Sequence, residues 1–332
     1  MPPLEFKDIT FDSIISIENL LYAWREFRRG KKARRDVQEF ELHLMDSILR
    51  LHYDLMQKTY THGPYEAFNI SDPKPRNIHK ATVRDRLLHH ALCRMLYPAF
   101  DRTFIAHSYS CRRNKGTHRA MDTFTAMARN VSNNHTKTVW VLKCDIRKFF
   151  ASIDHDVLQR IVRQKISDKN VLWLLQNITD SFETEHGKGL PLGNLTSQLL
   201  VNIYMNEFDQ YVKRILKARW YARYADDFVF MSVDKLVLLQ LLPRIAEFLR
   251  DNLSLLLHPD KVSIHTVDSG IDFLGFVHFS HRRVIRTTSK RRMLRRLGEV
   301  GDKKESIQAY LGLLSHGNCW GLMKEIQRFK RM

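Results

Sequence analysis

The amino-acid sequence predicts an α+β fold in which helices accompany an antiparallel sheet, and three observations lead to it. Between Tyr221 and Met231, strand-forming residues flank two adjacent acids, the pattern of a β-hairpin whose tip carries the acids. The run from Val139 to Ile146 is apolar almost throughout, as expected of a buried strand. From Ser197 to about Lys217, apolar residues recur at helical spacing and form one face. With 332 residues and 44% hydrophobic content, the chain can bury a sizeable core.

The first part of the chain is expected to be mainly helical. Residues 11–27 and 37–58 each have the apolar pattern of an amphipathic helix. The segment between them, residues 28–35, carries six positive charges in eight positions. This suits either a phosphate-contacting loop or a solvated connection between helices. Asp72 to Ile78 contains two prolines and predicts an extended turn, and a further helix begins near Val83.

The second part mixes helices with short strands. Asp154 is expected to cap a helix that runs to about Ile166. Two strand-like runs, residues 262–267 and 271–279, flank Asp268-Ser269-Gly270, which predicts that they form a hairpin. Further helices are expected over residues 236–252, in the basic stretch 290–296 and from Ser306 onward.

Three carboxylates are candidate functional groups: Asp226 and Asp227 at the expected hairpin tip, and Asp145 at the end of the apolar strand. Crowded carboxylates repel each other unless a proton or a cation lies between them, and Mg²⁺ prefers oxygen ligands. An isolated Asp-Asp pair is more often an acidic turn that faces water. A third acid on a neighbouring strand favours a site for two Mg²⁺ ions about 3.5–4 Å apart, as used for in-line attack on phosphates.

The charge of the chain indicates its class of partner. The 54 Lys and Arg residues outnumber the 36 Asp and Glu residues, which gives a formal net charge of +18. Such a surplus predicts a polyanionic partner, because neutralised phosphates release counterions. An acidic membrane is the alternative, but we see no leader and no uninterrupted apolar segment, so we expect a cytoplasmic protein without membrane association. The four cysteines lack metal-binding spacing and predict neither a zinc site nor a disulfide framework.

Four ordered motifs resemble the palm motifs of reverse transcriptases, and their order and spacing make the resemblance specific where a lone YxDD would not be. They are Asp145-x-x-x-Phe149-Phe150, residues 189–198, Tyr224-Ala225-Asp226-Asp227 and Phe273-Leu274-Gly275-Phe276. The resemblance implies a right-hand polymerase with fingers, a palm made of an antiparallel sheet plus helices, and a short helical thumb. We expect the N-terminal extension and fingers over residues 1–138, the palm with residual fingers elements over 139–279, and the thumb over 280–332. We expect no RNase H, endonuclease or maturase module.

The resemblance also implies how the acids act. Asp145 and Asp226 would bind two Mg²⁺ ions, for which Mn²⁺ can substitute; the Ile146 carbonyl would complete one metal site, and Asp227 would assist. Lys261 matches a family lysine near the triphosphate. It is a candidate general acid for the leaving pyrophosphate, with a surface charge as the alternative.

Four residues are implied to contact the incoming nucleotide or the template. Arg76, with Lys74 second, matches the basic residue of the fingers that reaches the triphosphate. Arg112 matches the arginine of the motif before the palm, although Arg113 replaces the family's proline. Phe150 matches the aromatic residue that packs under the sugar, where a ring would clash with a 2′-hydroxyl and favour deoxynucleotides. Core packing is the alternative for Phe150.

The most informative departure from the family pattern is Leu192, which stands where many reverse transcriptases have Gln. An aliphatic side chain provides no directional hydrogen bond, so lower fidelity is expected. In addition, the stretch from Gly193 to Gln198 ends in Ser-Gln, where intron enzymes have Ser-Pro. Both features resemble the reverse transcriptases of diversity-generating retroelements, which are related to the group II intron enzymes. Leu192, Gly193 and Gln198 are therefore assigned to the nucleotide site.

Two further features predict contacts with the primer and with the RNA–DNA hybrid. Leu274-Gly275 resembles the primer grip, where a glycine lets the backbone approach the primer. Arg291, Arg292 and Arg295 belong to the basic helical region of the expected thumb and are implied to contact the RNA–DNA hybrid.

The combined expectation is an RNA-dependent DNA polymerase that makes cDNA from a specific structured RNA by two-metal nucleotidyl transfer. The resemblance implies errors at template adenines for mutagenic retrohoming, and dNTPs, a structured noncoding RNA and a small basic oligomeric accessory protein as partners. It also implies a bacterial or phage-encoded protein. One alternative is a defence-associated bacterial reverse transcriptase that uses its own noncoding RNA. The other is a non-catalytic RNA-binding protein with a polymerase fold.

Overall fold

The computed structural model describes residues 5–71, 75–300 and 304–329. The chain divides into two compact units. The first unit comprises Met1–Ala106, Ile146–Ile215 and Ala246–Leu256, and the second comprises His107–Asp145, Leu216–Ile245 and Leu257–Met332. Helices and antiparallel sheets both contribute, so the predicted α+β class is confirmed. The three-part division into fingers, palm and thumb stays a prediction.

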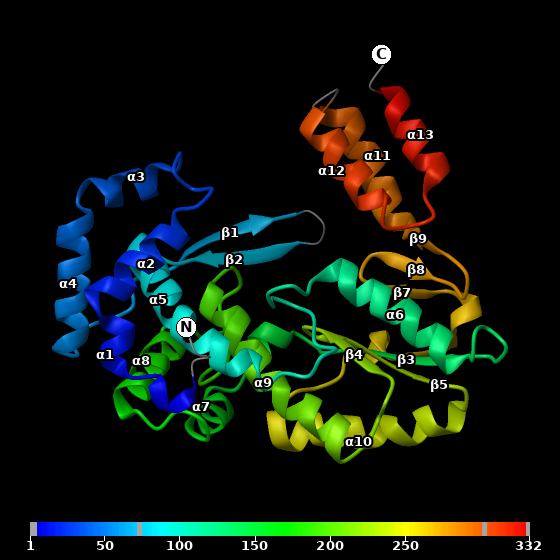
Figure 1. Ribbon diagram of the computed structural model, residues 1–332, viewed down its shortest axis with the longest axis horizontal. Helices are drawn as coiled ribbons and strands as arrows, with labels where there is room; N and C mark the ends of the chain where they lie inside the picture. Colours follow the sequence, from blue (N-terminus) through cyan, green and yellow to red (C-terminus); the bar gives the residue numbers. More distant parts are fainter. Residues whose placement is uncertain (1–4, 72–74, 301–303, 330–332) are drawn as a thin grey trace. The chain divides into compact units, whose positions relative to one another are not determined.

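The first unit begins with short helices that pack on a long one (Figure 1). Each of the two amphipathic helices expected here is broken into two. Ser16 leaves the helical conformation with ψ 140° and caps the next helix by accepting a hydrogen bond from the Asn19 backbone N–H. His43 interrupts the second pair with φ −118° and ψ 36°. The elements are η1 (Phe6–Asp8), α1 (Phe11–Ile15), α2 (Ile17–Phe27), α3 (Arg35–Leu42) and α4 (Leu44–Met56).

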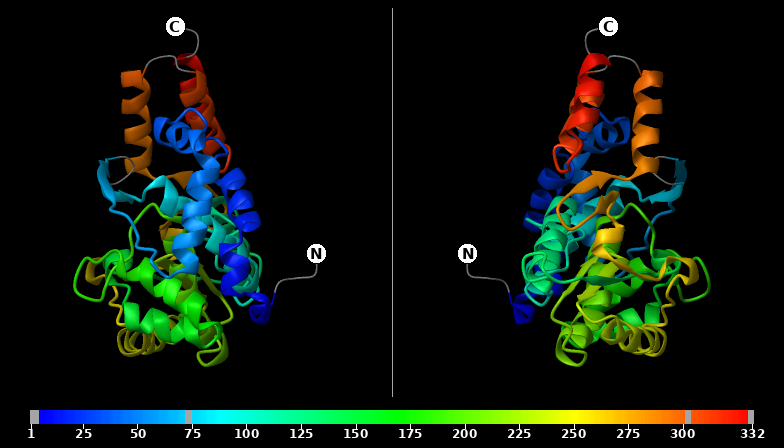
Figure 2. Two further views of the ribbon diagram at one scale, coloured as in Figure 1. Left: turned by 90° about the vertical axis from the view of Figure 1, so that its left-hand side faces the viewer. Right: turned by 90° about the vertical axis from the view of Figure 1, so that its right-hand side faces the viewer.

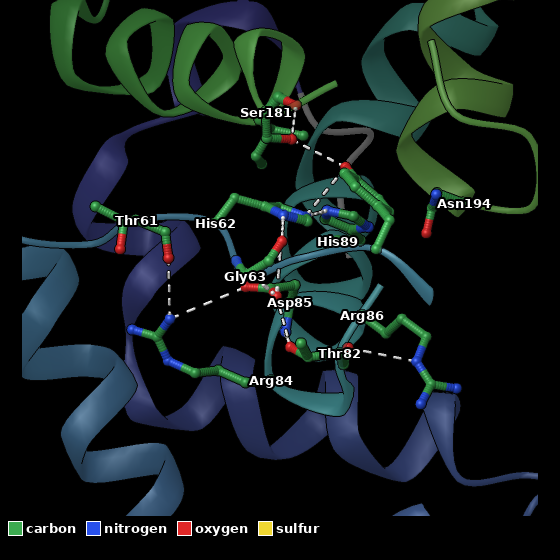
Figure 3. Close-up of polar contacts among 12 residues, drawn as sticks. Thr61, His62, Gly63, Thr82, Arg84, Asp85, Arg86, His89, Ser181 and Asn194 are labelled. Atoms are coloured by element: carbon green, nitrogen blue, oxygen red, sulfur yellow. Dashed lines mark hydrogen bonds and ion pairs between the residues drawn. The ribbon is translucent and has the colours of Figure 1, made fainter. Parts of the chain in front are cut away.

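The long helix is α5 (Val83–Asp101), whose first turn is anchored by a buried acid. The Thr82 hydroxyl caps α5 by accepting from the Asp85 N–H. The Asp85 carboxylate in turn accepts from the Tyr60 hydroxyl at 2.7 Å and from the Gly63 N–H at 3.1 Å, as Figure 3 shows for Gly63. The start of α5 is thereby fixed to the segment that follows α4.

The rest of the first unit consists of one hairpin and a further set of helices. β1 (Glu66–Ile70) pairs antiparallel with β2 (Arg76–Lys80). As predicted, Asp154 caps a helix, because its carboxylate accepts from the Val157 N–H at 3.0 Å. The remaining elements are η2 (Phe149–Ser152), α7 (His155–Arg163), α8 (Lys169–Asp180) and α9 (Leu195–Arg214), with α10 (Lys235–Leu253) divided between the two units.

The second unit is built on a four-stranded antiparallel sheet with the order β4-β5-β3-β6. Helix α6 (Thr117–Val131) packs against β4 and β5 over an apolar core that includes Phe124, Val141 and Val229 (Figure 1). The strands are β3 (Trp140–Asp145), β4 (Tyr221–Tyr224), β5 (Asp227–Ser232) and β6 (Ser263–Thr266). The acidic hairpin and the apolar strand predicted from the sequence are therefore neighbours.

One expected hairpin is wrong. Residues 263–266 form β6 and pair with β3, not with the run that starts at Ile271. That run folds back on itself instead, because Leu274 and Gly275 both have positive φ, 54° and 87°, and make a two-residue turn. The result is a separate sheet of β7 (Ile271–Phe273), β8 (Phe276–His278) and β9 (Arg283–Ile285), with η3 (Pro259–Lys261) and η4 (Val267–Ser269) before it.

Three helices complete the second unit and stand side by side in both views of Figure 2. They are α11 (Thr287–Val300), α12 (Lys304–Leu314) and α13 (Trp320–Phe329). Their apolar faces share a second core that includes Met293, Ile307 and Ile326. None of the helices within the described residues has the length and apolar character needed to cross a bilayer.

Candidate functional site

Strand pairing in the second unit brings the three predicted acids together. Asp145 is the last residue of β3 and lies directly opposite Asp227, the first residue of β5. Asp226 occupies the two-residue turn between β4 and β5, after Ala225, which has φ 55°. Residues opposite each other in an antiparallel pair have Cβ atoms about 4.5–5.5 Å apart. The hairpin tip and the strand end thus form one carboxylate site.

A buried arginine braces the turn, and the sequence reasoning missed it. Arg223 is 1% exposed. Its guanidinium donates to the Ala225 carbonyl at 3.1 Å and to the Ser108 hydroxyl at 3.0 Å. Arg223 also exchanges backbone hydrogen bonds with His107 and Tyr109. An arginine at an inward position of a predicted strand could have indicated a buried structural role. Its partners in residues 107–109, however, are distant from it in the sequence.

Burial and neighbouring charges perturb Asp227 in the carboxylate site. The pKa of Asp227 is raised to about 7, chiefly by burial and further by Asp226, Asp145 and Asp272, against the lowering effect of Lys143. The Lys143 ammonium lies 3.6 Å from Asp227 Oδ2. Lys143 precedes Asp145 by two residues on β3, so both side chains share a face of the sheet. That spacing was visible in the sequence, and Lys143 was nevertheless not predicted.

Lys261, which the resemblance implied to lie near the triphosphate, is in contact with the carboxylate site. Its ammonium is 2.9 Å from Asp145 Oδ1. The His258 N–H donates to the Asp145 carbonyl at 2.8 Å, which attaches η3 to the end of β3. This contact carries Lys261 to the acids although more than a hundred residues separate it from Asp145 in the sequence.

The donor atoms of the site suit a hard divalent cation. Asp227 Oδ1 is buried and has no hydrogen-bond partner among the described residues. Such an atom is costly to bury unless something else satisfies it. The carboxylates offer only oxygen, which Mg²⁺ and Mn²⁺ favour. Among the residues that the structure describes, no group of three or more His, Cys, Asp or Glu side chains is arranged so that it could hold a metal ion as it stands.

A second set of predicted residues meets in the first unit. The Leu192 carbonyl accepts from the His79 N–H of β2 at 3.0 Å, and the Asn194 amide donates to the His79 carbonyl at 2.9 Å. Gly193 has φ 105°, and a Cβ there would lie 2.8 Å from the side chain of Ile78. Gly193 is therefore required both by its backbone conformation and by close packing on β2. The same strand begins with Arg76.

Phe150 joins this set through the backbone. Its carbonyl accepts from the Leu190 N–H at 2.8 Å, just before Leu192. Gln198 lies in the first turn of α9, and its carbonyl accepts from the Asn202 amide at 3.2 Å. Ile146 is buried and directly follows Asp145. Lys74 lies outside the described residues.

The remaining predicted residues belong to the second unit but not to the carboxylate site. Arg112 donates to the Ser108 carbonyl at 3.0 Å. Leu274 and Gly275 form the turn between β7 and β8, where open space surrounds the position of a Gly275 Cβ. The three predicted thumb residues lie on α11: Arg291 and Arg295 are exposed, and Arg292 is partly buried.

Comparison with known sequences gives one consistent result. The family model described as "Reverse transcriptase (RNA-dependent DNA polymerase)" matches residues 70–278. Protein YkfC of Escherichia coli is 27% identical over 299 residues, which cover 79% of this chain and 75% of the relative. The group II intron-encoded protein LtrA of Lactococcus lactis is 25% identical over 179 residues, 51% of this chain and 29% of LtrA. A putative COX1/OXI3 intron 1 protein of Saccharomyces cerevisiae is 29% identical over 159 residues, 45% of this chain and 18% of that protein.

Solved structures agree at the level of the fold. Telomerase from Candida albicans, in complex with a fragment of telomeric RNA, superimposes with a TM-score of 0.50 and 9% identity over 69% of this chain. Apo telomerase from Candida tropicalis gives a TM-score of 0.50 and 10% identity over 74% of this chain. The matches span 48% and 60% of the respective telomerase chains. The predicted polymerase fold is thereby confirmed.

Proposed function

Because this chain belongs to the reverse transcriptase family and is an RNA-directed DNA polymerase, we propose that its carboxylate site joins deoxynucleotides to a primer by two-metal catalysis. The observation that carries the proposal is the placement of Asp145 opposite Asp227, with Asp226 at the adjoining turn. A binding module has no need to keep three mutually repelling acids together.

The donor set supports a divalent metal site. Asp145 and Asp226 would hold two Mg²⁺ ions, with Mn²⁺ able to substitute; the Ile146 carbonyl would complete one site, and Asp227 would assist through its unpartnered Oδ1. When bound, the metal ions would activate the primer 3′-hydroxyl and stabilise the negative charge of the triphosphate. The Lys143 and Lys261 ammonium groups partly compensate the carboxylate charge near Asp227 and Asp145.

Lys261 is the proposed general acid. Its contact with Asp145 places the ammonium at the carboxylate site, within reach of a triphosphate held there. A protonated lysine can donate its proton to the departing pyrophosphate, which would otherwise leave with a full additional charge.

Contacts with the nucleotide are proposed for the residues gathered around β2. Arg76 would pair with the triphosphate, and Phe150 would exclude a ribose 2′-hydroxyl. Leu192 and Gly193 would face the nucleotide, and Gln198 would support that loop. Lys74 and Arg112 remain proposed nucleotide or template contacts.

Leu274 and Gly275 would contact the primer, and the thumb arginines Arg291, Arg292 and Arg295 would contact the hybrid's phosphates.

We further propose the diversity-generating type. Leu192 in place of the family's Gln, and Ser197-Gln198 in place of Ser-Pro, support it. The proposal includes a structured RNA template and a small basic accessory protein as partners, because that type requires both. The similar proteins include intron-encoded proteins such as LtrA, which agrees with an origin in a mobile element.

Primer extension tests the catalytic proposal. Wild type with Mg²⁺, dNTPs and a primed RNA template should make templated DNA. Asp145→Asn should lower the rate by about 10³-fold or more, since a lost metal ligand removes several kcal/mol of transition-state stabilisation. Glu185→Gln, which changes an exposed acid, is the matched control and should leave the rate unchanged. Equal rates for wild type and Asp145→Asn would contradict two-metal catalysis at this site.

Sequencing of the product tests the subtype. Leu192→Gln restores an amide that can hydrogen-bond to the base pair, so misincorporation opposite template adenine should fall by about 10-fold. Leu190→Met, a volume-conserving change in the same loop at a buried position, is the control. An error spectrum that is unchanged in Leu192→Gln would contradict the role of Leu192, while the polymerase activity itself would stand.

A further inference from the structure

The second unit contains a large groove that shares no residue with the carboxylate site. It has a volume of about 920 Å³ and lies between α6, the loop from α6 to β3, the turn from β8 to β9 and the connection from α12 to α13. We call it the α6 groove. The loop enters β3 at Trp140, whereas the carboxylate site lies at Asp145, the other end of that strand (Figure 1). Five residue steps of about 3.3 Å separate these ends by roughly 17 Å.

Cationic and ring-bearing side chains dominate the α6 groove. Arg129, Arg282, Arg283, His135 and His281 all line it. The one carboxylate in the lining, Asp122, lies 2.8 Å from the Arg283 guanidinium and is neutralised by it. The groove therefore has a net positive charge, from Arg129 and Arg282, that no acid of its own lining compensates. Such a lining recognises an anion.

The loop from α6 to β3 is held in an unusual conformation that presents His135 to the groove. Asn133, Asn134 and His135 have φ of 51°, 58° and 66°, three consecutive left-handed residues of which none is glycine. The Ser132 hydroxyl accepts from the His135 N–H at 2.8 Å and helps hold the turn. Left-handed residues other than glycine cost free energy and persist only where the surroundings enforce them. The conformation places the His135 ring 4.3 Å from the His281 ring, measured between centroids.

Uncharged polar groups complete the lining. The amide of Asn134 accepts from Arg129 Nε at 2.9 Å and so fixes the direction of that guanidinium. Asn130, Asn318, Ser280 and Thr125 add amide and hydroxyl groups. A site of this volume accepts a ligand much larger than one phosphate ion. Guanidinium groups pair with phosphates, imidazole rings stack on bases, and amides hydrogen-bond to a ribose 2′-hydroxyl.

We propose that the α6 groove binds single-stranded RNA, at a site separate from the catalytic carboxylates. Arg129 and Arg282 contact successive phosphates, and an unpaired base stacks on one of the two imidazole rings of His135 and His281, whose planes are tilted by 47° to each other. The amide and hydroxyl groups of the lining can hydrogen-bond to the 2′-hydroxyl of RNA, which DNA lacks. The site anchors an RNA segment that is not being copied.

Binding measurements test the groove without any need for catalysis. The variant Arg129→Gln/Arg282→Gln removes the two uncompensated cations and leaves Arg283, which pairs with Asp122, in place. Arg163→Gln/Lys165→Gln is the charge-matched control, because both residues are exposed cations at the end of α7. Fluorescence anisotropy with an RNA of about 15 nucleotides, and with DNA of the same sequence, compares the full-length proteins without dNTPs.

The groove variant should bind the RNA roughly 20-fold more weakly at ~0.1 M salt and reduce the slope of log K against log salt by about 1.4, or 0.7 per phosphate. The control should change both quantities much less. A groove variant that binds RNA as the control does, or that loses RNA and DNA affinity equally, overturns the proposal. Failure of primer extension in the wild type would leave these binding results unaffected, so the two proposals fail separately.

Crosslinking gives a second readout that needs no substitution. Wild-type protein is irradiated with the same RNA carrying 4-thiouridine, and the attached peptides are identified. Crosslinks to peptides that contain His135 or His281 support the groove. Crosslinks confined to other peptides overturn it, whatever the variants show.

Discussion

Individual neighbouring side chains influence how readily a buried group in this protein takes up or releases a proton. At the carboxylate site, Lys143 and Lys261 compensate part of the charge of Asp227 and Asp145. At His278, Asp272 and Asp122 offset only part of the effect of burial. This ring is 1% exposed and packs 4.5 Å from the ring of Phe124, centroid to centroid. The cost of charging an incompletely compensated buried group appears as a displaced pKa.

His278 gives a prediction about pH. Burial, followed by the charge of Arg283, lowers the pKa of His278 to about 4, whereas an unfolded chain has a histidine pKa of about 6.5. Below pH ~6.5 the unfolded chain takes up a proton that the folded protein does not, so the free energy of unfolding falls as the pH drops towards 4. In His278→Leu, the contribution of His278 to this loss of stability should disappear. The free energy of unfolding should then differ between pH 7 and pH 5 by about 1–2 kcal/mol less than it does in wild type.

Urea unfolding at several pH values measures the effect of His278. The control is His265→Leu, which changes an exposed histidine on β6 and should leave the pH dependence as in wild type. His89 and His90 on α5 also have pKa values lowered by burial and will supply a common background in all three proteins. Identical pH profiles for His278→Leu and wild type would contradict the assignment.

At the scale of elements, the ends of helices and strands position the groups that matter. The β4–β5 turn places Asp226, the end of β3 places Asp145, and η3 delivers Lys261. The start of α5, which is not part of the carboxylate site, shows the same role of element ends. There the Asp85 carboxylate accepts hydrogen bonds from Gly63 and Thr82 (Figure 3) and also from Tyr60. Side chains at element ends thus tie together segments that are separate in the sequence.

Asp85 gives a prediction about stability. Asp85→Ala would leave the buried Tyr60 hydroxyl and the partly buried Gly63 N–H without their acceptor, at about 1–3 kcal/mol for each donor, and would also remove the hydrogen bond from the exposed Thr82 hydroxyl. The free energy of unfolding should therefore fall by about 3–5 kcal/mol, as measured by chemical denaturation. Asp46→Ala is the matched control, since Asp46 holds the same first-turn position of α4 but is exposed. It should cost less than about 1 kcal/mol; equal losses in both variants would contradict the role of the buried acceptors.

At the scale of the whole molecule, the net charge of +18 governs association with polyanions. The surplus is spread over many exposed Lys and Arg side chains, each of which can neutralise a phosphate. The polymerase fold and the family membership make RNA and its DNA copy the relevant polyanions.

The salt dependence of RNA binding follows from the net charge. For wild type, a plot of log K against log salt should be linear with a slope steeper than about −3, which corresponds to more than four phosphate contacts at 0.7 each. Titration of a single-stranded RNA between ~50 and ~400 mM KCl measures it. A slope near zero would show that the positive charge of the chain does not contact the RNA backbone.

Local sequence patterns predicted much of the fold. The alternation and turn residues around Asp226 predicted the β4–β5 hairpin, the apolar run predicted β3 with Asp145 at its end, and the capping role of Asp154 was confirmed. The breaks at Ser16 and His43 were missed, because apolar periodicity continues across them. Each success depended on residues that are close together in the chain.

By itself, the sequence determined the family, the polymerase fold and the presence of three acids at a strand end and a hairpin tip. Only the tertiary structure decided that β6 pairs with β3, that Arg223 braces the turn and that Lys143 and Lys261 stand beside the acids. It also decided that Asn133 to His135 adopt left-handed conformations and bring His135 to His281. The physical reason is the range of the interactions: pairing, ion pairs and burial join residues distant in sequence, whose mutual placement no local propensity encodes.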